Sequence, residues 1–221
     1  MHLPARRVDY AAFVLVAVGV AGIVGHFWAQ EYGGIGWSGI TVGAGILIVG
    51  VCHVPRIAAA PIPVAVRAHI ALAFVNIVPA AAMGVLLGFN KVHPFLPGYV
   101  QTNVYAHAHL AAIGWAALMV VGVACRLLPM FAADLRVVLD DGERPRATTR
   151  APHDMPWRPG QHVVFGLWSI GVPLLATGLA LDHVNAVRAG ACALLAATLL
   201  DSLQAALILR HAHFSPRSAS A

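Results

Sequence analysis

The chain has 221 residues, of which 59% are hydrophobic and only 10% are charged, and its formal net charge is +5. A soluble domain carries about 25% charged residues, so the composition excludes an ordinary soluble protein and needs the bilayer as its solvent. The positive charge does not indicate a nucleic-acid-binding protein. The basic residues lie in short segments between apolar runs, where membrane topology accounts for them.

Six apolar segments are each long enough to cross a bilayer, which takes about 20 helical residues. We expect all six to be helices, because a backbone exposed to hydrocarbon must satisfy its own hydrogen bonds. The predicted spans are residues 10–30, 37–57, 66–90, 104–131, 161–182 and 186–213. The sequence therefore predicts an all-α fold in which residues 1–221 form a single six-span transmembrane bundle.

The first three spans each carry a histidine close to one end. His26 ends the first span on the side that we expect to be outside, and GGIG at 33–36 predicts a tight turn before the second span. His53 and His69 lie near the inner ends of the second and third spans. An ionisable side chain inside a span is a functional candidate, because it is costly in hydrocarbon without a partner.

The fourth span opens with two histidines, His107 and His109. At about 100° per residue, this spacing puts the rings roughly 200° apart, so they leave the helix on opposite sides. A single chelated metal prefers histidines four residues apart. Imidazoles on opposite sides instead suit two partners, such as two haems that flank one helix. Gly114 and Gly122 would let a neighbouring helix or a flat macrocycle approach closely.

The stretch HAHLAAIGW…VACRLLPMF resembles the tenth helix of the haem–copper oxidase catalytic subunit, most closely in its nitric-oxide-reductase and C-family oxidase branches. The matching residues are His107, His109, Gly114, Trp115, Gly122, Arg126, Leu128 and Pro129. The resemblance implies that His107 binds the iron of an active-site haem and His109 the iron of an electron-transfer haem. The family's copper site needs an adjacent histidine pair, which this chain lacks. We therefore expect haem b without a recognisable copper site.

A haem with two histidine ligands needs a second imidazole at the depth of His109. His26 and His183 both end spans on the predicted outer side. His26 is preferred, because the family's other low-spin ligand also lies on an early span. The inner-side histidines are too distant, since the hydrocarbon core is roughly 30 Å thick. A c-type haem is not expected, because the chain has no C-x-x-C-H motif.

The basic residues predict the orientation. With the N-terminus inside, twelve arginines lie on the inner side and only Lys91 and Arg188 lie outside. Several of the inner arginines belong to a predicted cytoplasmic loop at 132–160, which is rich in charge and proline. The sequence thus predicts a multi-pass protein of the inner (plasma) membrane with both termini in the cytoplasm.

The last two spans add His162 at an inner end and Asp201, roughly 20 Å below the outer end of its helix at 1.5 Å per residue. His53, His69 and His162 could converge with Asp201 in a second, inner site. The carboxylate would then take up protons or orient a ligating histidine. The alternative is a structural hydrogen bond to Asp201 from Arg126 or His162.

Three functions remain open on the sequence. The first is a haem-binding membrane protein for electron transfer or for redox or gas sensing, and so a possible oxidoreductase component of a respiratory chain. The second is a protein that binds or transports copper or another metal through its outer histidines. The third is a structural subunit of a larger complex. For the protein as a whole, the expected partners are the lipid bilayer and other membrane or redox subunits, and not nucleic acid.

Overall fold

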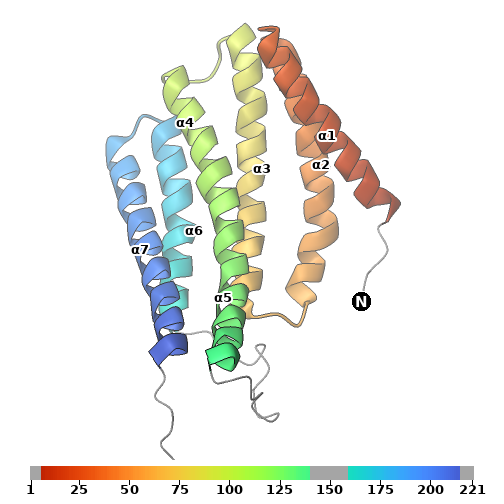
Figure 1. The fold of residues 1–221 in the computed structure, drawn as a ribbon. Helices are drawn as coiled ribbons and strands as arrows, with labels where there is room; N and C mark the ends of the chain where they lie inside the picture. The colour runs from red at the N-terminus through yellow and green to blue at the C-terminus, as the bar shows by residue number, and fades with distance from the viewer. Residues whose placement is uncertain (1–5, 140–158, 215–221) are drawn as a thin grey trace, which may run out of the picture.

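In a computed structural model, the described residues are 6–139 and 159–214, and they form a bundle of helices (Figure 1). No strand occurs in this part of the chain. The helices are α1 (Arg7–Trp28), α2 (Tyr32–Ala59), α3 (Val64–Val92), α4 (Val100–Ala111), the π-helix η1 (Ala112–Ala117), α5 (Leu118–Leu139), α6 (Pro159–Ala180) and α7 (Val184–Phe214). Within the described residues, six helical segments are long and apolar enough to cross a membrane, because α4, η1 and the first part of α5 are continuous.

The predicted all-α fold and its six spans are therefore confirmed, and the helices are longer than predicted at most of their ends. The largest extension is at the end of the fourth span, where α5 continues to Leu139. Residues 132–139 are helical and do not belong to the predicted loop 132–160, whose segment 140–158 lies outside the described residues. Hydropathy marks only the part of a helix that suits hydrocarbon, whereas the backbone can stay helical into the interface.

The predicted turn at 33–36 was wrong, because α2 already begins at Tyr32. The chain reverses at residues 29–31, where Gln30 takes a left-handed conformation with φ 59°. The Glu31 carboxylate then accepts a hydrogen bond from the Gly34 N–H at 2.9 Å and caps the new helix. The glycine-rich stretch serves helix packing instead: a Cβ on Gly88 of α3 would lie 2.7 Å from the Gly36 nitrogen.

The helices follow one another across the bundle (Figure 1). Among the described elements, α1 packs against α2 alone, α2 packs also against α3, and α3 packs against the fourth span. Helix α7 packs on α6, and these two cover α4 and α5. We call the end with loops 29–31, 93–99 and 181–183 the upper end, as drawn in Figure 1, and the opposite end the lower end.

Large apolar side chains cover the outside of the bundle. Phe13, Val51 and Val120 are 71%, 74% and 68% exposed. The core is confined to the faces where α3, the fourth span, α6 and α7 meet, and it includes Ile77, Leu118 and Val172. An apolar exterior of this extent fits contact with the lipid bilayer and a multi-pass membrane protein.

The π-helix η1 interrupts the span that carries His107 and His109. At its centre, Gly114 lies between α3 and α6: a Cβ there would come within 2.8 Å of Val172 and 2.9 Å of Asn76. A π-turn holds one extra residue, so the residues after it face about 100° away from where an unbroken α-helix would put them. The sequence predicted an uninterrupted helix, and hydropathy carries no signal for such a turn.

Candidate functional site

His107 is held against α3. Its ring Nδ1 lies 2.9 Å from the Ala80 carbonyl oxygen, and because a carbonyl only accepts, Nδ1–H is the donor. The contact is possible because Gly84, one turn further along α3, has no side chain. A Cβ at Gly84 would come within 2.9 Å of the His107 Cε1 atom. The ring Nε2 makes no hydrogen bond within the described residues.

His109 is anchored to its own helix. Its Nδ1–H donates to the Tyr105 carbonyl oxygen, one turn earlier in α4, at 2.7 Å. The side chain is partly exposed at the edge of the bundle, and its Nε2 also lacks a hydrogen bond among the described residues. His107 and His109 thus have different neighbours, as expected for side chains roughly 200° apart on a helix.

Both α4 rings have the tautomer found in metal-ligating histidines, which donate one ring N–H to a carbonyl and present the other nitrogen. This donor set fits haem iron at His109, whose Nε2 belongs to a ring at the edge of the bundle. At His107 the tautomer fits equally well, but the ring occupies the space that Gly84 leaves on α3. The chemistry of the two imidazoles is therefore alike and their surroundings differ.

His26 lies apart from the α4 histidines. Its ring covers Gly34 of α2, and its Nδ1 is 3.8 Å from the Glu31 carboxylate. Among the described elements α1 packs only against α2, and α2 does not pack against α4. His26, which was predicted as the second ligand beside His109, thus lies on α1, and α2 and α3 separate this helix from α4.

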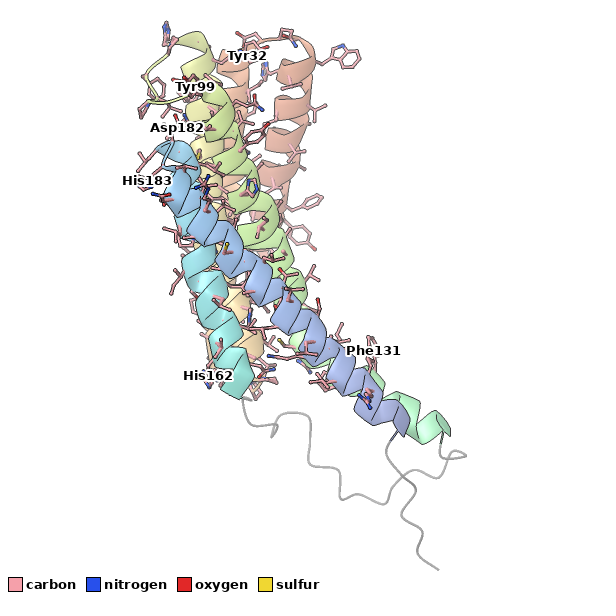
Figure 2. All side chains as sticks on the ribbon, turned by 90° about the vertical axis from the view of Figure 1, so that its left-hand side faces the viewer. Tyr32, Tyr99, Phe131, His162, Asp182 and His183 are labelled. Atoms are coloured by element: carbon pink, nitrogen blue, oxygen red, sulfur yellow. The ribbon has the colours of Figure 1, made fainter. Side chains whose placement is uncertain are left out.

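His183 caps the start of α7 at the upper end (Figure 2). Its Nδ1 accepts the Ala186 backbone N–H at 3.3 Å, so the ring proton of a neutral His183 is on Nε2. This tautomer is opposite to that of the α4 histidines. The preceding residue, Asp182, ties the loop to the start of α4 by accepting the Tyr99 N–H at 3.4 Å. Among the described residues, no hydrogen bond or ring contact joins His183 to His107 or His109.

The inner histidines belong to different parts of the bundle. His53 of α2 pairs with Asp9 of α1, with Nε2 and Oδ1 3.1 Å apart. His162 lies in the first turn of α6 at the lower end (Figure 2). The structure directs His53 toward α1 and away from the core in which His69 lies. The Asp9 pairing was missed, although both residues lie near inner helix ends in the sequence.

His69 is the most buried ionisable side chain described, with 1% of its surface exposed. Its Nδ1–H donates to the Ala65 carbonyl at 2.8 Å, and its ring meets the Phe165 ring edge-on at 5.3 Å between centroids. Gly122 of α5 leaves room for it: a Cβ there would lie 3.1 Å from the His69 Cβ. The other ring nitrogen, Nε2, is buried without a hydrogen-bond partner. Such an atom costs about 1–3 kcal/mol.

Asp201 of α7 faces α6. One carboxylate oxygen, Oδ2, accepts the Trp168 indole N–H at 2.9 Å. The sequence had suggested Arg126 or His162 as the hydrogen-bond partner of Asp201. Among the described residues, the donor to its carboxylate is Trp168. The signal was available, because a tryptophan in mid-span needs an acceptor for its N–H.

Asp201 and Trp168 line a cavity of about 510 Å³ between η1, α5, α6 and α7, which is open on the outer face of the bundle. Its other lining residues are Ile113, Ala117, Val120, Val121, Leu194, Leu195, Thr198 and Ser202. Aliphatic side chains thus form most of the wall, and α7 supplies two hydroxyls and the carboxylate. Neither His107 nor His109 contributes to it.

The fold and these groups define the class of the protein: an all-helical, multi-pass membrane protein with ionisable side chains inside the bundle. No protein-family model, curated protein or solved structure matches the chain. Within the described residues, no three histidine, cysteine or acidic side chains lie close enough together to hold a metal ion.

Proposed function

We propose that this chain is a haem-binding integral membrane protein with a redox or gas-sensing role, in which His109 is an axial ligand of haem b. The observation that carries the proposal is the shared tautomer of the two α4 histidines. Each Nδ1–H donates to a backbone carbonyl, and each Nε2 stays without a hydrogen bond among the described residues. Metal-ligating histidines have this arrangement, in which one ring N–H donates to a carbonyl and the other nitrogen is available to the metal.

The chain's own residues orient the ligand. The Tyr105 carbonyl fixes the ring of His109 and increases the basicity of Nε2, as a hydrogen-bonded carbonyl does for metal-ligating histidines. Ala80 does the same for His107, which we propose as the ligand on the other side of α4. A haem bound at these positions supplies reversible one-electron chemistry and can bind diatomic gases.

The packing of the helices and the hydrogen bond of His183 favour one protein ligand per haem. His26 lies on a helix that does not pack against α4, and the Nδ1 of His183 is engaged at the start of α7. A haem held by one imidazole keeps an open coordination position, which suits gas sensing, whereas a second imidazole suits electron transfer alone. We therefore propose that His109 would be the one protein residue that holds this haem, which would suit the binding of a diatomic gas.

The test is the visible spectrum of the detergent-purified protein, oxidised and reduced, with haem content measured per chain. We expect a Soret band in the wild type and a broad reduced spectrum typical of five-coordinate haem. His109→Ala should lower the haem content at least tenfold, because it removes the iron ligand. His183→Ala is the matched control and should keep it, because that ring caps a helix.

Other outcomes separate the competing functions. Sharp α and β bands on reduction would show a second axial ligand and favour electron transfer. Full haem content in His109→Ala would refute the assignment of this residue. A colourless wild-type protein with stoichiometric copper would replace the proposal with the metal-binding function. A colourless, metal-free protein that co-purifies with another subunit would favour a structural role.

A further inference from the structure

The cavity between η1, α5, α6 and α7 is open toward the outside of the bundle, where Val120 and Leu195 are 68% and 61% exposed, so a membrane-soluble molecule can reach it from the bilayer. Its volume of about 510 Å³ falls in the range of ligand pockets, roughly 300–1,000 Å³. Its wall is mostly aliphatic, and the polar groups come from one helix, where Thr198, Asp201 and Ser202 follow one another along α7. Such a wall favours a ligand that is apolar over most of its surface and polar at one end.

The polar end of the cavity is rich in hydrogen-bond acceptors. The Thr198 hydroxyl already donates to the Leu194 carbonyl at 2.8 Å, so toward the cavity it can only accept. Asp201 accepts the Trp168 N–H with Oδ2, and its Oδ1 makes no hydrogen bond among the described residues. The Ser202 hydroxyl can donate or accept, so the group that complements this end is a ligand hydroxyl, which donates to Asp201 and can accept from Ser202.

His69 provides an independent sign that this region is built for chemistry. It is 1% exposed and has a buried Nε2 without a partner, and its ring contacts Phe165 of α6, the helix that also carries Trp168. A titratable side chain buried inside a span is costly to keep in hydrocarbon and marks functional positions in membrane proteins. If packing were its only role, an apolar side chain at this position would stabilise the bundle with a smaller desolvation penalty.

We infer that this cavity binds a membrane-soluble molecule of the phenol or quinol class, whose hydroxyl donates to Asp201 and whose ring lies between Trp168 and η1. The indole of Trp168 supplies a flat surface for an aromatic ring. Ala117, whose small side chain faces it from the fourth span, leaves space for that ring. The site lies apart from His107 and His109, so it does not depend on haem binding at α4.

Binding is tested with a matched pair of probes, 4-nonylphenol and 4-nonylanisole, which differ only in whether the oxygen carries a hydrogen. Calorimetric titration of the detergent-purified full chain, at one fixed micelle concentration, gives both affinities. We expect the phenol to bind at least tenfold more tightly, because only it can donate to the carboxylate. Nonylamine tests whether a cationic head is preferred to a hydroxyl.

Two variants locate the site. Asp201→Asn should bring the ratio of the two affinities close to one, and Ala117→Phe should abolish binding of both probes by filling the cavity. Asp182→Asn, in the loop before α7, is the control and should keep the tenfold ratio. If Asp201→Asn does not fold, the site is tested with two other variants of its lining, Ala117→Phe and Thr198→Val.

The inference fails if the two probes bind equally to the wild type, or if their ratio persists in Asp201→Asn. It also fails if Ala117→Phe binds both probes as the wild type does. Tighter binding of nonylamine than of the phenol would overturn the assigned ligand class. None of these results depends on the spectrum of the protein, so the haem proposal and this one can fail separately.

Discussion

At the scale of single residues, the orientation of the α4 histidines depends on what the facing helix lacks. Sequence spacing predicted that His107 and His109 leave α4 on opposite sides, and their different neighbours agree with this. The spacing could not predict that the His107 ring would contact α3, because that contact requires Gly84 of α3 to lie at the same level of the bundle as His107. Helix periodicity is local information, whereas the register between two helices is set by packing along their whole length.

Gly84→Ala should destabilise the protein by about 1–3 kcal/mol, since the new methyl group would meet the His107 ring and strain its bond to Ala80. Thermal unfolding in detergent measures the effect. Gly43→Ala on α2 is the matched control, because its Cβ would meet only the Ala81 Cβ at 3.9 Å, an ordinary contact. That variant should be neutral or slightly more stable, as alanine favours the helix. Equal melting temperatures for the two variants would contradict this account.

The same limit explains the partners of the ionisable side chains in the lower half of the bundle. The positions of Asp201 and His69 in their spans marked both as unusual. Neither the Trp168 donor nor the unsatisfied His69 Nε2 follows from the sequence. The first depends on which faces of α6 and α7 meet, and the second on how α5 and α6 pack on α3. Candidate residues could be predicted here, and their pairing could not.

At the scale of the elements, the π-helix η1 is the main departure from the predicted spans. It sits between the segment with His107 and His109 and the segment that lines the cavity, and it contributes Ile113 and Ala117 to the cavity wall. A π-turn is less stable than an α-helical turn, and such turns are frequent at functional sites. Its place in the fourth span fits that pattern.

Deleting Ala116, which is exposed, should convert η1 into a regular α-helix and leave α5 in register with its neighbours. We expect a melting temperature at or above that of the wild type. Binding of 4-nonylphenol should fall at least tenfold, because the cavity wall at Ile113 and Ala117 is rearranged. A deletion variant that binds the probe as before would show that the π-turn does not shape the cavity.

Helices α6 and α7 depend on glycines where they cross. A Cβ at Gly190 of α7 would lie 2.5 Å from the Leu175 backbone nitrogen, and one at Gly178 of α6 would lie 2.7 Å from the Val187 nitrogen. Backbone atoms cannot move aside as a side chain does, so small residues are required for this close approach.

Gly190→Ala should therefore separate α6 from α7 and cost at least about 1–3 kcal/mol, the usual cost of overpacking. Unfolding by titration with a denaturing detergent measures the loss. Gly166→Ala on α6 is the control, because its Cβ would meet nothing within 4 Å. If both variants unfold at the same detergent fraction, the crossing does not need its glycine.

At the scale of the whole molecule, hydropathy was sufficient to predict the six spans, since each apolar run is long enough to identify a helix that must bury its backbone bonds. The number of spans being even, both ends of the described chain lie on the same side of the bundle. Which side faces the cytoplasm stays a prediction from the arginines; of those in the described residues, Arg188 lies near the upper end and the others lie toward the lower end.

Cysteine labelling in intact cells tests this orientation. With Cys52, Cys125 and Cys192 replaced by alanine, a cysteine at Gln30 of the upper end should react with a membrane-impermeant maleimide. A cysteine at Pro61 of the lower end should react only after permeabilisation, because the positive-inside rule puts that loop in the cytoplasm. Both positions lie in exposed loops, so accessibility alone does not separate them. The opposite pattern would reverse the topology.

The edge position of α1 has a consequence for how the protein is made. Within the described chain, α1 has α2 as its only neighbour, so α1 can complete its contacts once α2 has been synthesised and before any later helix. The α1–α2 hairpin can insert into the membrane first, and α3 can then pack on the free face of α2. The remaining helices, whose contacts cross between α3, α5, α6 and α7, must assemble after the ribosome has delivered nearly the whole chain.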